Sequence, residues 1–135
     1  MSAAVTPGTV YAENVVKTEN LSKRYGDRTV VHDISINVRT GEIVGLLGPN
    51  GAGKTTTFYM ITGIIKPTTG HVFLNDLDIA GWPLHDRARV GLSDLPQESP
   101  IFRSLSVLDN LIIILEYTGL KKSERKERAM ELLRE

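Results

Sequence analysis

The stretch Gly48-Pro49-Asn50-Gly51-Ala52-Gly53-Lys54-Thr55 satisfies the pattern G-x-x-x-x-G-K-[ST], which is the signature of a phosphate-binding loop. Its glycines allow positive φ angles, which turn successive backbone N–H groups inward around an anion. Lys54 can then reach the outer phosphates of a nucleotide, and the hydroxyl of Thr55 can ligate a Mg²⁺ ion that bridges them. The stretch therefore predicts nucleotide binding by residues 48–55 and by the adjoining Thr56, with Lys54 as a catalytic residue and Thr55 as a metal ligand.

The sequence on both sides of this loop fits the same prediction. Residues 42–47 (EIVGLL) form an apolar run typical of a buried strand, and residues 55–65 (TTTFYMITGII) are predicted to form the following helix. The N-terminus of that helix would add partial positive charge at the phosphates. We therefore expect an α/β fold in which the loop joins a strand to a helix.

The remaining elements are predicted from hydrophobic periodicity and from turn residues. Strands are expected at residues 15–21, 30–38, 71–74 and 92–95, and helices at 84–90, at 107–117 and from Ser123 onward. Ser106 can cap the 107–117 helix together with Asp109, and Gly119 ends it.

The two ends of the chain give different predictions. Residues 1–14 mix small and polar side chains without a sustained period, so they are expected to be a flexible N-terminal extension. The final helix runs to Glu135 with an apolar stripe that includes Ala129 and Leu132, and no packing partner for this stripe is evident. We therefore expect residues 15–135 to be the N-terminal part of a larger domain.

Composition excludes several classes of protein. The 135 residues are enough for one core, and 16 basic residues offset 16 acidic ones without a large block of either sign, which argues against binding to nucleic acid. The absence of cysteine excludes disulfides and thiolate metal sites. Three widely spaced histidines favour ordinary surface residues over metal ligands. The longest apolar run, residues 111–115, is too short to span a bilayer, so a membrane role would require a partner.

The phosphate-binding loop alone is compatible with a kinase, a GTPase, a DNA-maintenance ATPase or a transporter motor. Its surroundings are more specific. Tyr25, residues 41–56 (GEIVGLLGPNGAGKTT), residues 67–70 (PTTG) and residues 95–97 (LPQ) together resemble the nucleotide-binding subunits of ABC transporters. The resemblance runs from about Val16 to the end of the chain. It implies an ABC-type α/β core with an antiparallel β subdomain and the start of a helical subdomain, with ATP and Mg²⁺ as cofactors.

The same resemblance implies roles for two further residues. The aromatic residue that matches Tyr25 stacks on adenine in this family, while the alternative is a strand-end tyrosine packed on the core. Gln97 matches the family's Q-loop glutamine, whose amide oxygen joins the Mg²⁺ shell or holds the water near the γ-phosphate. Gln97 is thus a predicted catalytic and metal-binding residue, and the alternative is a solvated loop glutamine.

Within the family, residues 57–60 (TFYM), 83–89 (PLHDRAR) and 95–110 are most similar to the ATPases that power lipopolysaccharide export. An ATPase subunit of a branched-chain amino-acid importer is the alternative. The resemblance implies a homodimer in the full-length protein, located peripherally on the cytoplasmic face of the cell membrane. It also implies contact with membrane-embedded subunits through Ile101, Phe102 and Arg103. Alternatively, Ile101 and Phe102 fill the core beneath the following helix.

The chain also departs from the family pattern. Residues 91–94 (GLSD) place Asp94 where the family has an aromatic residue. The sequence contains no Leu-Ser-Gly-Gly signature, no apolar run ending in Asp-Glu and no later switch histidine, which in this family lie beyond the position of Glu135. We therefore expect this chain to be inactive by itself. Two further hypotheses are a nucleotide-binding module without turnover and a GTPase, although no Asn-Lys-x-Asp guanine motif is present.

Overall fold

The computed structural model describes residues 13–96, 98 and 100–135, and the chain divides into two compact units between Asp94 and Leu95. Each unit is described by itself. The predicted extension, residues 1–14, lies almost wholly outside the described residues. Asn14 is described, and its backbone N–H donates to Thr40 Oγ1 over 2.7 Å while its carbonyl accepts from the Thr40 N–H over 2.9 Å.

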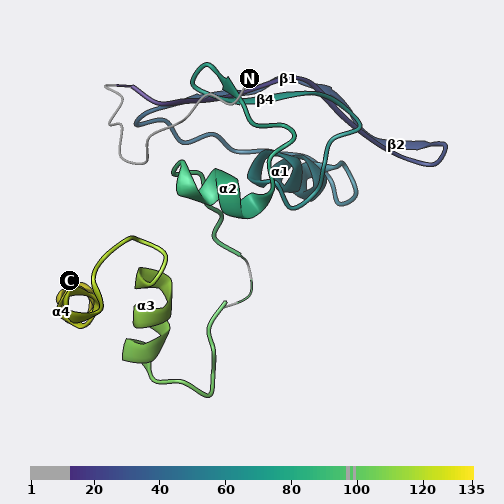
Figure 1. Ribbon diagram of the computed structural model, residues 1–135. Coiled ribbons are helices and arrows are strands. Elements are labelled where there is room, and N and C mark those ends of the chain that lie inside the picture. Colours follow the sequence, from purple (N-terminus) through teal and green to yellow (C-terminus); the bar gives the residue numbers. More distant parts are fainter. Residues whose placement is uncertain (1–12, 97, 99) are drawn as a thin grey trace. The chain divides into compact units, whose positions relative to one another are not determined.

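The first unit is built on an antiparallel sheet around the long strand β1 (Val15–Tyr25). This strand pairs with β2 (Arg28–Ile34), β3 (Asn37–Arg39) and β4 (Thr69–Leu74), and β4 pairs in turn with β5 (Leu77–Asp78). The turn at Gly26 and Asp27 sets the β1–β2 register, so that Tyr25 lies opposite Arg28. The helices α1 (Lys54–Thr62) and α2 (Leu84–Arg89) lie on one side of this sheet (Figure 1).

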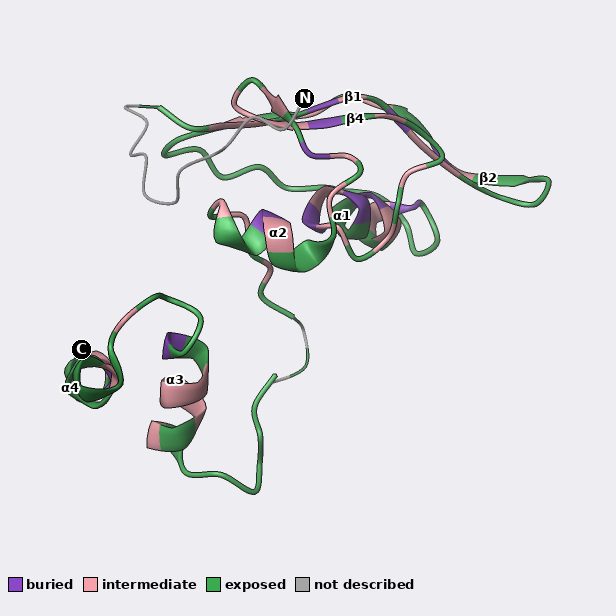
Figure 2. Cartoon of the chain, in the orientation of Figure 1, coloured by how far each residue is buried: buried purple, intermediate pink, exposed green. Residues whose placement is uncertain are grey.

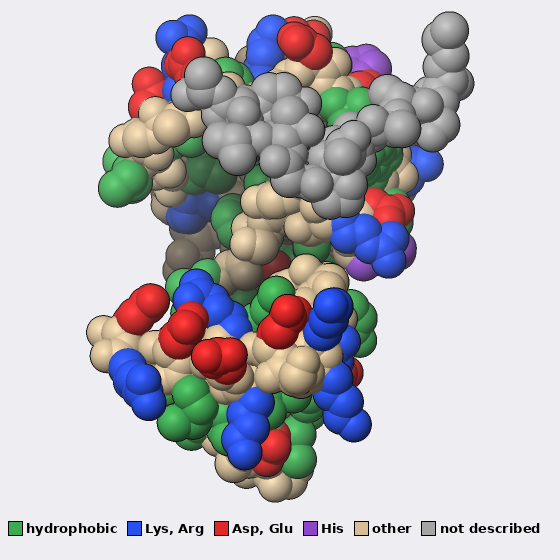
Figure 3. Space-filling view, turned by 60° about the vertical axis from the view of Figure 1, so that its left-hand side comes forward, with side chains coloured by type: hydrophobic (Ala, Val, Ile, Leu, Met, Phe, Trp, Pro, Cys, Tyr) green, Lys and Arg blue, Asp and Glu red, His purple; other side chains and the backbone are tan. Residues whose placement is uncertain are grey.

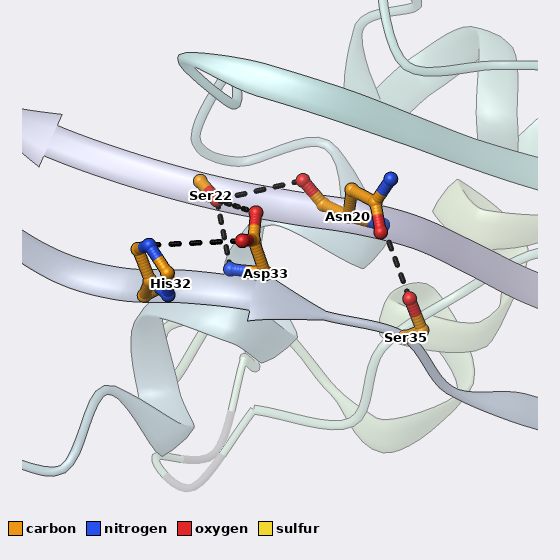
Figure 4. Close-up of polar contacts among 5 residues, drawn as sticks. All are labelled: Asn20, Ser22, His32, Asp33 and Ser35. Carbon is orange, nitrogen blue, oxygen red and sulfur yellow. Dashed lines mark hydrogen bonds and ion pairs between the residues drawn. The ribbon is translucent and has the colours of Figure 1, made fainter.

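The register of β1 against β2 shifts on both sides of Lys23, and polar side chains hold this irregularity (Figure 4). The Asp33 N–H donates to Ser22 Oγ over 2.9 Å, and Ser22 Oγ donates to Asp33 Oδ1 over 3.2 Å. His32 Nε2 lies 3.6 Å from Asp33 Oδ2. Serine, histidine and aspartate are the residues of a hydrolase triad, but here the hydroxyl bonds to the carboxylate and not to the imidazole. The cluster is therefore structural.

The core of the first unit lies between the sheet and α1. Five side chains at most 4% exposed form it: Leu21, Val31, Met60, Val72 and Ile79. They come from β1, β2, α1, β4 and the segment after β5, each of which contributes one buried side chain to this cluster (Figure 2). Complete burial of an aliphatic side chain stabilises the fold by about 1.5 to 3 kcal/mol, which makes this cluster the main link between the helix and the sheet.

The Arg87 side chain, only 1% exposed, joins three segments of the first unit. Its guanidinium donates to the carbonyls of Met60 and Ile61 at the end of α1, over 2.8 and 2.6 Å, and also to the carbonyls of Ala80 and Trp82. Burial lowers the pKa of Arg87 and the nearby Asp78 carboxylate offsets part of this effect. A cation at a helix C-terminus is also favoured by the helix dipole.

The second unit consists of two helices, α3 (Val107–Leu115) and α4 (Lys122–Leu132), which pack against each other. The predicted cap of α3 is confirmed, because the Asp109 N–H donates to Ser106 Oγ over 3.1 Å. Leu115 and Ala129 are buried, and Arg125 forms an ion pair with Glu116 over 3.3 Å. Figure 3 shows acidic and basic side chains interspersed over the face in view, without a large area of either sign.

Two strand predictions are wrong, and a third strand is divided. Residues 42–47 form no strand, Ile43 and Leu47 are 100% and 97% exposed, and no strand of the described chain pairs with them. A strand needs hydrogen-bonding neighbours, which apolar sequence alone does not supply. Residues 92–95 likewise form no strand, and Leu95 is 88% exposed. The strand predicted at 30–38 is divided into β2 and β3. Between them the Thr18 hydroxyl donates to the Ile34 carbonyl and accepts from the Ile36 N–H, so a side chain bonds to the backbone at this break.

Candidate nucleotide-binding site

Gly53 fixes the phosphate-binding loop against the sheet. It is the N-cap of α1, with φ of 84°. A Cβ atom at this position would lie 2.7 Å from the Val30 carbonyl oxygen and 2.9 Å from Val31 Cγ2. Both the left-handed backbone and the close approach require glycine. Gly53 therefore lies directly beside β2 at the point where α1 begins.

The Lys54 side chain folds over the loop that precedes it. Its ammonium group donates to the Gly48 carbonyl and to the Pro49 carbonyl, the latter over 3.0 Å. The Ala52 N–H donates to the same Pro49 carbonyl over 3.2 Å, which closes a turn inside the loop. The positive charge of Lys54 is thereby held at the loop, where the motif predicts the phosphates.

The threonines at the start of α1 divide into two groups. Thr55 is exposed and Thr56 is half-buried, and both line the concavity described below. Thr57 is buried, and its hydroxyl donates to the Gly53 carbonyl over 2.8 Å. The Thr55 hydroxyl is therefore available to a metal ion at the first turn, whereas Thr57 stabilises the helix start.

A concavity of about 380 Å³ lies over the loop and extends to the β1–β2 hairpin. Tyr25, Arg28, Val30 and residues 50–56 line it. The structure thus brings Tyr25, with 51% of its surface exposed, to the same hollow as the loop residues predicted to bind nucleotide. Gly48 and Pro49 do not line it but hold Lys54. The sequence prediction missed Arg28 and Val30, although the two-residue turn after Tyr25 could have indicated Arg28.

The electrostatics of this concavity suit a polyanion. Arg28 and Lys54 are cations, and no acidic residue occurs among the described residues that line the concavity. The Lys23 ammonium lies 4.9 Å from the centre of the Tyr25 ring and donates to the Lys66 carbonyl over 2.7 Å. A cation over an aromatic face is a favourable contact, so Lys23 helps to fix the Tyr25 ring.

A second concavity of about 480 Å³ lies over β1 and β4. It is lined by Glu13, Val15, Lys17, Glu19, Phe73, Asn75 and Asp76, with an ion pair of 2.5 Å between Lys17 and Glu19. It is larger, but it contains three acidic residues and no phosphate-binding backbone. It therefore lacks the features that the phosphate-binding motif predicts for a nucleotide site.

The other predicted site residues are Gln97 and residues 101–103. Gln97 is outside the described residues. The side chains of Ile101 and Phe102 are 57% and 58% exposed, and Arg103 is exposed as well. The Phe102 N–H donates to Asn110 Oδ1 over 2.8 Å and its carbonyl accepts from Asn110 Nδ2 over 3.1 Å, so α3 fixes the backbone of this segment. Ile101 and Phe102 therefore do not fill the core beneath α3.

Among the described residues, none of the helices combines the length and the apolar character that are needed to cross a bilayer. A sequence model of the ABC transporter family matches residues 31–135. The chain belongs to the ABC transporter family. Its match includes the phosphate-binding loop, α1 and the whole second unit.

Relatives within this family share about half of their aligned residues with this chain. The lipopolysaccharide export system ATP-binding protein LptB of Acidithiobacillus ferridurans is 52% identical over 90% of this chain and 50% of its own length. LptB of Escherichia coli K12 is 54% identical over 87% of this chain and 49% of its own length. The chain thus spans about half the length of these relatives.

Solved structures give the same family. An ATP-binding subunit of an ABC transporter superposes with a TM-score of 0.72 at 30% identity, over 90% of this chain and 50% of that one. A nucleotide-free ATP-binding cassette from an ABC transporter superposes with a TM-score of 0.69 at 28% identity, over 83% of this chain and 44% of that one. The prediction of an ABC-type fold with an antiparallel sheet is confirmed.

Proposed function

We propose that this chain binds ATP with Mg²⁺ at the phosphate-binding loop, and that the whole protein hydrolyses ATP to power a transporter. The observation that carries the proposal is that Tyr25, Lys54, Thr55 and loop residues 50–53 all line one concavity. The flat aromatic face of Tyr25 suits a base, and the Lys54 cation with the loop N–H groups suits phosphates.

Each residue has a distinct proposed task. Lys54 and the N–H groups of residues 50–56 would neutralise the phosphates, and Tyr25 would stack on the adenine. The exposed Thr55 hydroxyl would supply one Mg²⁺ ligand, since threonine at the first turn is the hard oxygen donor that Mg²⁺ takes in such loops. Among the described residues no group of three acidic or histidine side chains could hold a metal by itself, so phosphate and water oxygens would complete the shell.

Hydrolysis needs more groups than this chain contains. The loop, Lys54 and the helix start would stabilise charge on the transferred phosphoryl group, and Gln97 is the proposed residue for placing the water. The missing Asp-Glu pair and Leu-Ser-Gly-Gly signature would supply the base and the facing half of the site. We therefore expect negligible ATPase activity from this chain alone, and turnover in the whole protein as a homodimer.

The proposed transport load is lipopolysaccharide, and the support is the identity of 52% and 54% to two LptB proteins. Such an ATPase would lie peripherally on the cytoplasmic face of the membrane and bind membrane-embedded subunits. Ile101, Phe102 and Arg103 are the proposed contact, because exposed aromatic and arginine side chains are frequent interface hot spots.

The test of nucleotide binding is calorimetric titration of the chain with ATP and Mg²⁺. Lys54→Ala should weaken ATP binding by roughly ten-fold to one hundred-fold, because it removes a charge-assisted phosphate contact. Lys126→Ala, which removes an equal charge from the exposed surface of α4, should bind like the parent. Equal affinity of the parent and Lys54→Ala would remove the loop from the proposal.

Turnover is tested separately. Phosphate release should be negligible for this chain and measurable for a chain that continues through the Asp-Glu pair. Lys54-dependent release from the present chain would show a catalytic carboxylate that the proposal lacks, with Asp94 and Glu98 the first to replace. A nucleotide-binding module without turnover is the alternative, and it requires that the longer chain also release no phosphate.

The partner contact is tested in the full-length protein. Phe102→Ala should leave ATP binding unchanged while co-purification with the membrane subunits falls. A large loss of thermal stability, or unchanged co-purification, would contradict the contact assigned to residues 101–103.

A further inference from the structure

The loop and Tyr25 leave one charged side chain of the concavity without a role, namely Arg28. Arg28 is exposed and stands at the start of β2, directly opposite Tyr25 in the β1–β2 register. Directly opposed residues of antiparallel strands place their side chains on the same face of the sheet. Arg28 and Tyr25 therefore approach the concavity together, from the hairpin side.

The neighbouring charges leave Arg28 free to bind an anion. Asp27 is the carboxylate nearest in sequence, and it pairs with Arg24, whose Nη2 lies 3.3 Å from Asp27 Oδ1. Arg24 Nε is also used, because it donates to the Gly26 carbonyl over 2.7 Å. Among the described residues, no ion pair involves Arg28.

We propose that Arg28 binds the α-phosphate of the nucleotide, the phosphate that joins the ribose to the rest of the chain. This inference rests on the proposed function. Tyr25 belongs to the β1–β2 hairpin, while Lys54 and Thr55 begin α1, and all three line the concavity. The proposed function therefore puts the adenine at the hairpin and the outer phosphates at the start of α1. The α-phosphate is the anionic group next to the nucleoside, and it therefore falls nearest the hairpin.

The chemistry of arginine fits this position. A guanidinium presents a planar fork of N–H donors that matches two oxygens of one phosphate, while a lysine ammonium offers only a point charge. The outer phosphates already have Lys54 and the loop N–H groups. Arg28 would thus recognise AMP, ADP and ATP through a group that all three contain.

The test is a titration of the 135-residue chain and of Arg28→Ala with AMP, ADP and ATP. A lost α-phosphate contact predicts a similar fall in affinity for all three, about ten-fold. Lys54→Ala should instead weaken ATP and ADP more than AMP. Arg28→Lys should recover only part of the affinity, because it restores the charge without the fork. Arg39→Ala, on β3 and outside the concavity, is the control for loss of one positive charge and should bind like the parent.

The other outcomes are distinct. Unchanged affinity in Arg28→Ala, with a parent that binds, overturns the inference and leaves the proposed function standing. If the loss of affinity in Arg28→Ala grows from AMP to ATP, Arg28 acts through the overall positive electrostatic field of the site. That result also overturns the α-phosphate contact. Failure of the parent itself to bind any of the three contradicts the proposed function, and the inference falls with it. Thermal melting of each variant separates lost binding from lost folding.

Discussion

Strand β1 (VVKTENLSKRY) is mostly polar and the segment 42–47 (EIVGLL) is mostly apolar, yet β1 is the paired strand. β1 pairs with three strands, and its Leu21 is 0% exposed. In the apolar segment, Ile43 is 100% exposed, and no other strand of the described chain pairs with it. The difference shows that apolar side chains favour burial, while ladder partners decide whether a segment becomes a strand.

Two glycines provide the largest test of this difference. A Cβ at Gly70, where φ is 89°, would lie 2.4 Å from the Asn20 carbonyl oxygen, so β4 approaches β1 too closely for any side chain. Gly70→Ala should therefore lower the free energy of unfolding by roughly 3 to 5 kcal/mol. Gly45, in the apolar segment, has no heavy atom within 4 Å of such a Cβ. Chemical denaturation should show Gly45→Ala within about 0.5 kcal/mol of the parent.

Leu21 and Ile43 extend the comparison to side chains. Leu21→Ala should cost about 3 kcal/mol, because it removes a completely buried side chain from the core. Ile43→Ala should change the free energy of unfolding by less than about 0.5 kcal/mol. Equal losses in the two variants would mean that the apolar segment is buried in solution.

Ser22 tests the irregular part of β1. Ser22→Ala removes the acceptor of the Asp33 N–H and the donor to the Asp33 carboxylate, both at an exposed site. We expect a loss of about 1 kcal/mol in thermal or chemical unfolding. Ser104→Ala, a change at an exposed serine of the second unit, is the control. A loss above 3 kcal/mol would show that the register of β1 depends on this hydroxyl.

The smallest expected effect concerns Asp78 in β5. Desolvation raises the pKa of Asp78, but hydrogen bonds from the Ala80 N–H and from His71, together with the charges of His71 and Arg87, lower it overall below 3.8. Because the pKa of Asp78 is lower in the folded state than in the unfolded state, the charged carboxylate stabilises the fold. This stabilisation is fully present above the unfolded-state pKa and is lost as the pH falls through the folded-state pKa. Because Asp78 is 41% exposed, the contribution should be small. Asp78→Asn should slightly reduce the loss of stability between pH 5 and pH 3.

The sequence predicted well those elements whose signals are local. The strands at 15–21 and 71–74, the helix after Lys54 and the cap at Ser106 all follow from short patterns, and the structure contains them. Residues 42–47 and 92–95 were predicted wrongly, because pairing depends on other parts of the chain.

The sequence also predicted part of the candidate site. The motif identified the loop, and the family resemblance identified Tyr25, which lines the same concavity. Arg28 was missed, although the two-residue turn at Gly26 and Asp27 is a local signal that places it opposite Tyr25. The role of Gln97 remains a prediction.

The four carbonyl contacts of Arg87 have a consequence for hydrogen exchange. If α2 opened alone, the guanidinium would leave, and the carbonyls of Met60 and Ile61 would lose their charged partner in a buried place. Such an opening is costly, so α2 and the last turn of α1 should open as one cooperative unit. Their amide protons should then exchange with solvent at a common free energy, although the two helices are separated by more than twenty residues of sequence.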